Sequence, residues 1–233
     1  MHNKHYLVVG GSSGIGLEVV KRLLAQGATV SVISRTADTL ANLDVHHHSA
    51  DVLADDLKQL DLPERLDGLV YCPGSITLKP FRSLKPEQFL ADYQINVLGA
   101  VKSIQAALKP LKKAGESSVV LYSTVAVGQG MSFHASIAAA KGAVEGLTRS
   151  IAAELAPAIR VNCIAPSLTD TPLAERLLST DDKREASNLR HPLKRVGTPE
   201  DIAAATLFLL SDQSSWVTGQ IFGIDGGMSA LKM

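Results

Sequence analysis

The chain has 233 residues, 45% of them hydrophobic, and its 23 basic and 23 acidic side chains give a formal net charge of zero. This length suffices for one sizeable α/β core, and the zero net charge gives no support for a nucleic-acid or anionic-membrane partner. No apolar run approaches the roughly 18 residues of a membrane span, we expect no signal peptide, and both cysteines lie in apolar runs typical of free thiols, so we expect a cytoplasmic protein.

The chain opens with a predicted strand, a glycine turn and a helix. An apolar run over 6–9 precedes the turn, and residues 17–26 carry apolar side chains at helical spacing before Gly27. Such a turn holds a phosphate against free backbone N–H groups and the positive end of the helix dipole. The residues expected to bind a dinucleotide pyrophosphate are Gly10, Ser12, Ser13, Gly14, Ile15 and Gly16, and an ordinary tight turn is the alternative.

The end of the second predicted strand, over 28–33, selects the cofactor. Ser34 leaves no carboxylate for the ribose of NAD, and Arg35 can pair with a 2′-phosphate, which favours NADP(H) over NAD(H); a solvated arginine is the alternative. The run His46–His48 lies in a third strand, where neighbours alternate faces, so we expect no metal site. Asp51 and Val52 follow, and Asp51 would meet the adenine amino group or cap a helix.

The rest of the chain continues this alternation. We expect strands over 68–72, 118–122, 160–164 and 220–224, and helices over 86–109, 135–155 and 199–210. Pro110 lies just beyond the helix over 86–109, and Thr198 would cap the helix over 199–210. Residues 166–195 show little strand character and should form a partly helical substrate lid. The order predicts an α/β fold, a single doubly wound parallel sheet with helices on both faces, in one domain over 1–233.

The helix over 135–155 is apolar or small almost all round, interrupted by Lys141 and Glu145. A helix of this composition is covered on both sides, by the sheet and by another helix or subunit. Ala143 and Gly146 would allow a close approach, so we expect a homo-oligomer.

Several blocks together resemble the short-chain dehydrogenase/reductase family over essentially the whole chain. They are Gly10-x-x-x-Gly14-Ile15-Gly16, Asn96-Val97-x-Gly99, Ala140-Lys141-Gly142-Ala143-Val144, the run from Arg160 to Pro166, and Gly219-Gln220-x-x-x-Ile224-Asp225-Gly226-Gly227. The resemblance implies a Rossmann-type, seven-stranded sheet and a tetramer or dimer.

The resemblance also implies roles for single residues. Asn96 would hold a water in a proton relay, Lys141 would bind the nicotinamide ribose, and Thr171 would meet the carboxamide. The family's catalytic serine falls on Thr124, with Ser123 beside it. Further residues expected against the cofactor are Cys72, Pro73, Gly74, Pro166, Ser167 and Leu168.

The chain departs from the family at the catalytic tyrosine, which falls on Ile137. Isoleucine can neither donate nor accept a proton. His134, three residues earlier, would share a helical face with Ile137 and is the first candidate for a substitute acid; an exposed helix-entry residue is the alternative, and Ser123 and Ser136 are weaker candidates.

Two further departures lie at the cofactor turn. The family's threonine before the turn is Val9, and its Asn-Ala-Gly is Cys72-Pro73-Gly74. Losing both polar side chains together leaves no buried partner unpaired, so we expect the turn to keep its shape.

Three functions remain in view. The first is an NADP(H)-dependent oxidoreductase that interconverts a carbonyl and an alcohol on a small, partly apolar substrate, with a modified proton donor. A general acid contributes typically 10²–10⁴-fold, and hydride positioning is a separate term that survives its loss. The alternatives are a catalytically silent cofactor-binding sensor or partner subunit, and a non-redox elimination or isomerisation. An apolar substrate portion is indicated by Leu168, Leu173, Leu177 and Leu178.

Overall fold

The computed structural model describes residues 1–232, and its centre is a parallel sheet in the order β3-β2-β1-β4-β5-β6-β7. The strands are β1 (His5–Val9), β2 (Thr29–Ser34), β3 (His46–Ser49), β4 (Gly68–Tyr71), β5 (Ser117–Tyr122), β6 (Ile159–Pro166) and β7 (Ile221–Ile224). All neighbours pair in parallel, which confirms the predicted doubly wound α/β sheet of seven strands.

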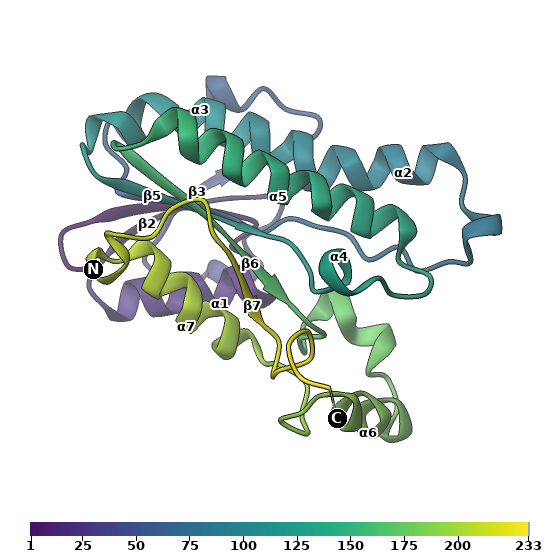
Figure 1. Cartoon of the computed structure of the whole chain (residues 1–233). Coiled ribbons are helices and arrows are strands. Elements are labelled where there is room, and N and C mark those ends of the chain that lie inside the picture. The colour runs from purple at the N-terminus through teal and green to yellow at the C-terminus, as the bar shows by residue number, and fades with distance from the viewer. Residues whose placement is uncertain (233) are drawn as a thin grey trace.

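Helices cover both faces of this sheet (Figure 1). They are α1 (Gly14–Ala25), α2 (Pro86–Tyr93), α3 (Gly99–Lys113), α4 (Ala126–Gln129), α5 (Ala135–Leu155), α6 (Asp181–Arg190) and α7 (Pro199–Leu210). The α1 and α7 helices lie on one face, and α3 and α5 lie on the other with α2 beside α5. None of the helices over 1–232 is both long and apolar enough to cross a membrane.

Because successive side chains of a strand point to opposite faces, the core consists of two clusters, one on each face of the sheet. Tyr6 and Val8 of β1 are fully buried in the cluster that contains residues of α1 and α7, whereas Leu7 and Val9 are buried with residues of α3 and α5. Strands buried on both faces read as continuous apolar runs, and this is why the strands were recognisable in the sequence.

The strand order reverses between β1 and β4. In open parallel sheets the connections leave such a point in opposite directions, and a crevice forms at the carboxyl ends of the strands. The segments that follow β1, β2, β4, β5 and β6 therefore meet at one edge.

The helices over 135–155 and 199–210 have the predicted bounds, and α1 begins at Gly14 rather than at residue 17. Thr198 caps α7 as expected: its side chain accepts from the N–H of Asp201, and the Asp201 carboxylate accepts from the N–H of Thr198. Gly27 follows α1 with a φ of 74°, as a residue just past a helix end does.

The long helix predicted over 86–109 is present as one unbroken helical run, but it contains a π-turn and extends past Pro110. The α2 helix ends at Tyr93, a π-helical turn spans Gln94–Leu98, and α3 continues to Lys113 with Pro110 inside it. The Tyr71 hydroxyl donates to the Ile95 carbonyl at 2.5 Å and so satisfies a backbone group within the π-turn. Pro110 is buried near the end of α3, where burial offsets the one backbone hydrogen bond that a proline lacks.

Candidate active site

A cleft of about 1120 Å³ opens at the carboxyl edge of the sheet. Every residue that the sequence placed against a cofactor or a substrate oxygen lines it, except Asn96 and Ser136. These residues are Gly10, Ser12, Ser13, Gly14, Ile15, Gly16, Ser34, Arg35, Asp51, Val52, Cys72, Pro73, Gly74, Ser123, Thr124, His134, Lys141, Pro166, Ser167, Leu168 and Thr171. The sheet topology therefore brings the predicted sites together.

The turn between β1 and α1 has free room and free donors for a phosphate. Ser13 stands at the N-cap of α1 without a side-chain cap hydrogen bond, and the first turn of α1 holds no acidic residue. A Cβ on Gly16 would collide with the carbonyl oxygen of Gly10, so only glycine fits there. Pro73 packs against Gly10, which shows how the turn is supported without the family's polar residues. The turn matches an anion site at a helix N-terminus.

The end of β2 lies beside this turn. The Ser34 hydroxyl donates to the Thr36 carbonyl at 2.8 Å and lies 3.0 Å from His47 Nε2, so it points inward. Arg35 is exposed at the cleft, and within residues 1–232 it forms no ion pair. Asp51 accepts from the N–H of Leu53 at 2.8 Å and caps a turn, so the alternative of a helix N-cap is wrong.

Lys141 and Asn96 converge above Gly74. The Lys141 ammonium donates to the Tyr122 carbonyl at 2.8 Å, and a Cβ built on Gly74 would lie 3.5 Å from Lys141 Nζ and 3.2 Å from Asn96 Oδ1. Asn96 is 1% exposed, and its Oδ1 has no partner among the described atoms. Burial lowers the pKa of Lys141 to about 8, and its neighbours Cys163, Cys72 and Asp92 partly offset this lowering.

The position at which the resemblance places the family's tyrosine is apolar. Ile137 is 5% exposed and lines the cleft. Tyr122 also lines the cleft, but its hydroxyl pairs with Thr206 at 2.7 Å, on the face covered by α7. No hydroxyl therefore replaces the tyrosine at its own position within the described chain.

The polar residues predicted to act on the substrate oxygen differ in the hydrogen bonds that they already make. The Thr124 hydroxyl accepts from the N–H of Ala126 at 3.3 Å and stands at the cleft wall. The Ser123 hydroxyl donates to Glu145 at 2.7 Å and is already engaged. His134 is the residue before α5, with its Nδ1 2.7 Å from the Ser132 carbonyl, and it lines the cleft. Ser136 is buried and does not line it.

Sequence reasoning missed a buried carboxylate. Asp92 is 2% exposed at the cleft and accepts hydrogen bonds from Ser75 at 2.6 Å, Thr77 at 3.0 Å and Ser136 at 2.7 Å. Its position four residues before Asn96 was the available signal, since two polar residues at this spacing share a helix face.

A second missed residue is His191 in the segment over 166–195. It is 2% exposed, with Nε2 2.6 Å from the Ser167 hydroxyl and Nδ1 2.7 Å from the Ser187 carbonyl. The ring therefore ties the chain after β6 to the end of α6.

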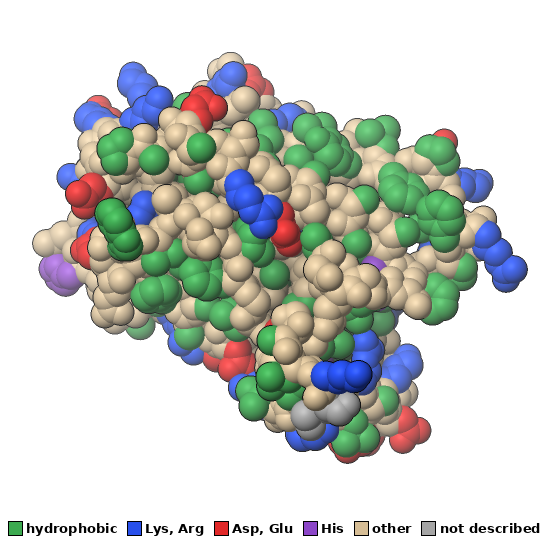
Figure 2. Space-filling model, viewed as in Figure 1, with side chains coloured by type: hydrophobic (Ala, Val, Ile, Leu, Met, Phe, Trp, Pro, Cys, Tyr) green, Lys and Arg blue, Asp and Glu red, His purple; other side chains and the backbone are tan. Residues whose placement is uncertain are grey.

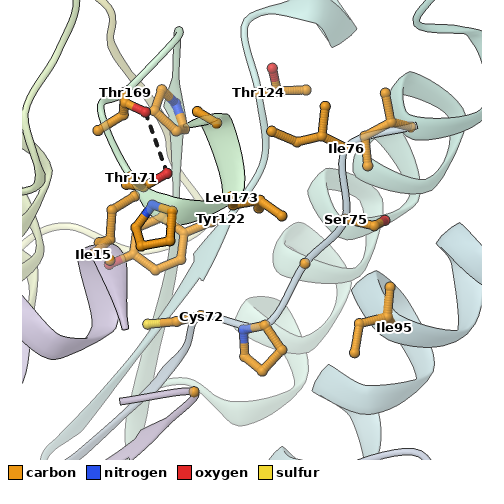
Figure 3. Close-up of a pocket in the computed structure, with 18 of the residues that line it drawn as sticks. Ile15, Cys72, Ser75, Ile76, Ile95, Tyr122, Thr124, Thr169, Thr171 and Leu173 are labelled. Atoms are coloured by element: carbon orange, nitrogen blue, oxygen red, sulfur yellow. Dashed lines mark hydrogen bonds between the residues drawn. The ribbon is translucent and has the colours of Figure 1, made fainter. Parts of the chain in front are cut away.

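Apolar side chains form another wall of the cleft. Figure 3 shows Ser75 and Ile76 on the segment that follows β4, and Ile95, Leu173 and Ile15 also line the cleft. Leu168 and Leu177 line the cleft as expected, whereas the expectation for Leu178 is wrong, because this side chain is buried outside it.

The comparisons with known proteins agree with this fold. The family model described as enoyl-(acyl carrier protein) reductase matches residues 9–229. The chain is 32% identical to 2-(S)-hydroxypropyl-CoM dehydrogenase 3 of Xanthobacter autotrophicus, over 99% of this chain and 98% of that protein, and 32% identical to L-xylulose reductase of Bos taurus, over 96% of each.

Solved structures show the same relationship. A short-chain type dehydrogenase/reductase from Mycobacterium ulcerans is 30% identical, with a TM-score of 0.89 over 98% of this chain and 90% of that one. Aldohexose dehydrogenase of Thermoplasma acidophilum is 26% identical, with a TM-score of 0.91 over 99% and 96%. The chain belongs to the short-chain dehydrogenase/reductase family, whose members bind nicotinamide cofactors.

Proposed function

We propose that the chain is an NADP(H)-dependent oxidoreductase that interconverts an alcohol and a carbonyl on a small, partly apolar substrate. The observation that carries the proposal is the cleft itself, in which an uncapped helix N-terminus, the unpaired Arg35 and Lys141 line one continuous space. When bound, the nicotinamide supplies or accepts a hydride.

The residues present fit this cofactor. The turn over 10–16 would hold the pyrophosphate on backbone N–H groups, since a Cβ on Gly16 is excluded. Asp51 and Val52 would meet the adenine, and residues 166–171 would cover the nicotinamide. Lys141 would donate to the ribose.

The preference for NADP(H) rests on the end of β2. An unpaired guanidinium at the cleft is a strong partner for a 2′-phosphate, and Ser34 brings no negative charge to repel it. The solved structure of ElxO with NADP bound is 25% identical to the chain, with a TM-score of 0.89 over 98% of this chain and 99% of that one.

The substrate would lie over the apolar wall of Ile76, Ile95 and Ile137, with its oxygen near Thr124. Residues 166–195 would act as its lid. Relatives named cyclopentanol dehydrogenase, 32% identical over 99% of this chain, make cyclopentanol a suitable first probe. The names of these relatives favour redox chemistry over the silent and non-redox alternatives.

Two wider features complete the proposal. The chain would assemble with copies of itself through the α5 face, as a tetramer or dimer. A cytoplasmic location would suit its free thiols at Cys72 and Cys163.

The test is turnover of an alcohol and ketone panel that begins with cyclopentanol and cyclopentanone, followed by nicotinamide absorbance with each cofactor. We expect turnover, faster with NADP(H). Tight NADP(H) binding without turnover of any panel member would favour a silent sensor, and product without an absorbance change would favour elimination or isomerisation.

A further inference from the structure

We propose that Ser75 and Asp92 replace the missing tyrosine: Ser75 exchanges a proton with the substrate oxygen, and Asp92 holds that proton. The proposal rests on the proposed oxidoreductase function and deepens it by assigning its proton route.

The two residues form a short path from the cleft to a buried carboxylate. Ser75 lines the cleft half-buried, and its hydroxyl donates to Asp92 Oδ1 at 2.6 Å. The Ser75 hydroxyl oxygen in turn accepts from Asn96 Nδ2 at 3.0 Å, and Asn96 Nδ2 also donates to the Asp92 backbone carbonyl at 2.8 Å. Asn96 thus fixes the Ser75 hydroxyl in place, beside the space that Lys141 and Asn96 Oδ1 share above Gly74.

The surroundings of Asp92 suit a proton acceptor. Its partners through side-chain atoms are the hydroxyls of Ser75, Thr77 and Ser136, and all three donate to it. The two oxygens of a carboxylate offer enough lone pairs to accept from all three hydroxyls. Asp92 is close enough to Lys141 to raise the pKa of that ammonium. A buried carboxylate bonded to neutral groups rather than to a cation gains more from a proton than a salt-bridged one would.

The step balances with the cofactor of the proposed function. In the oxidative direction the alcohol O–H gives its proton to Ser75 Oγ while Ser75 gives its own proton to Asp92 Oδ1. A bound nicotinamide would accept the hydride from the C–H bond that breaks, as the C–O bond becomes C=O. The alcohol would be oxidised at the expense of the nicotinamide, and one proton would stay on Asp92; reduction would run through the same positions in reverse.

The other polar groups at the cleft are less suited to this role. Ser123 donates to Glu145, and the Tyr122 hydroxyl pairs with Thr206. Both ring nitrogens of His191 have partners within the segment over 166–195. His134 lies at the start of α5 with no carboxylate among its hydrogen-bond partners, so a proton that it takes has no buried acceptor.

The activity test measures NADP⁺-dependent oxidation of cyclopentanol. Because general acid–base catalysis contributes about 10²–10⁴-fold, we expect Ser75→Ala and Asp92→Asn each to lower kcat about 10²-fold with KM and NADPH affinity nearly unchanged. Ser75→Thr keeps the hydroxyl and should restore most of kcat. The double variant should lose no more than Ser75→Ala, since both residues serve one step.

Ser118→Ala is the matched control. It removes a buried hydroxyl that donates to the Leu209 carbonyl at 2.7 Å and does not line the cleft, so it reports the purely structural cost of losing a buried hydroxyl. We expect a loss of thermal stability like that of Ser75→Ala, with less than about a threefold loss of kcat.

A second readout needs neither cofactor nor turnover. The infrared difference spectrum of the cofactor-free chain, wild type minus Asp92→Asn, should show a carboxylate band and no carboxylic-acid C=O band. A carboxylic-acid band, or full kcat in Ser75→Ala, overturns the proton route alone. No turnover of any panel alcohol by the wild type overturns the route together with the proposed function.

Discussion

The charge of the Lys141 ammonium is expected to decide how strongly the cleft binds NADPH. Burial in the second turn of α5 lowers the pKa of Lys141 to about 8, so its side chain is mainly charged below that pH and mainly neutral above it. Only the charged form is a strong donor to ribose hydroxyls. The affinity for NADPH should therefore fall as the pH rises through about 8.

Fluorescence titration of NADPH between pH 6 and 10 measures this change. Lys141→Arg is the control, because a guanidinium stays charged over the whole range and should remove the pH dependence. A wild-type affinity that is flat between pH 7 and 9 would show that the ammonium does not bind the cofactor.

Arg35 tests the cofactor preference at the same scale. Arg35→Asp replaces the free guanidinium by a carboxylate, which should repel a 2′-phosphate and accept hydrogen bonds from the ribose of NAD. We expect the ratio of NADP⁺ to NAD⁺ affinity to fall at least tenfold and reverse. Calorimetric titration of both cofactors measures it, and an unchanged ratio would place the 2′-phosphate elsewhere.

Ile137 tests whether the rest of the site is intact. Ile137→Tyr restores a hydroxyl four residues before Lys141, and we expect at least a tenfold rise in kcat on cyclopentanol. Ser75→Ala should then cost less in the Ile137→Tyr background than in the wild type, because the tyrosine provides a second route. Equal losses in both backgrounds would show that the tyrosine does not enter the proton path.

The cleft residues that could be predicted from the sequence are those whose place follows from the strand that precedes them. The glycine turn and Arg35 each follow the end of a strand. Because parallel strands place their carboxyl ends at one edge of the sheet, their positions in the sequence sufficed to predict that they line the same cleft. Asp92 and Ser75 could not be found in this way. Their contact joins α2 to the chain after β4, and it depends on how the helix turns as it packs.

At the scale of elements, the turn between β1 and α1 can be tested by comparing two glycine substitutions. Gly16→Ala places a Cβ against the Gly10 carbonyl, so the turn must shift and we expect at least a tenfold loss of NADPH affinity. Gly128→Ala in α4 is the control: nothing lies within 4 Å of its Cβ, and affinity should stay unchanged. NADPH titration and thermal denaturation of both variants measure the difference, and equal affinities would contradict the proposed phosphate site.

Elements with capping signals at both ends were the best predicted. The α7 helix matched its bounds because Thr198 and Asp201 form a reciprocal cap that the sequence displays. The helix predicted over 86–109 is present, but its π-turn was not predicted, because tertiary contacts decide it. Tyr71 reaches the π-turn only because Gly99 has no Cβ, and neither residue signals this contact in a local pattern.

The whole molecule leaves one side of α5 uncovered. Ala139, Gly146 and Ala153 are exposed at helical spacing, and nothing lies within 4 Å of a Cβ on Gly146. Leu90 and Tyr93 of α2 are exposed as well, and Figure 2 shows hydrophobic side chains gathered over the α2 end of this layer. Small residues next to exposed apolar ones allow a second copy to pack closely.

We therefore expect the wild type to elute as a homo-oligomer at micromolar concentration, and Gly146→Glu to dissociate it by at least one step, because a buried unpaired carboxylate is costly at a helix contact. Gln26→Glu adds the same charge at the exposed end of α1 and should leave the assembly unchanged. Multi-angle light scattering of the three proteins measures their masses. A monomeric wild type would refute the assembly, and an oligomer that survives Gly146→Glu would move the interface away from α5 to another surface of the fold.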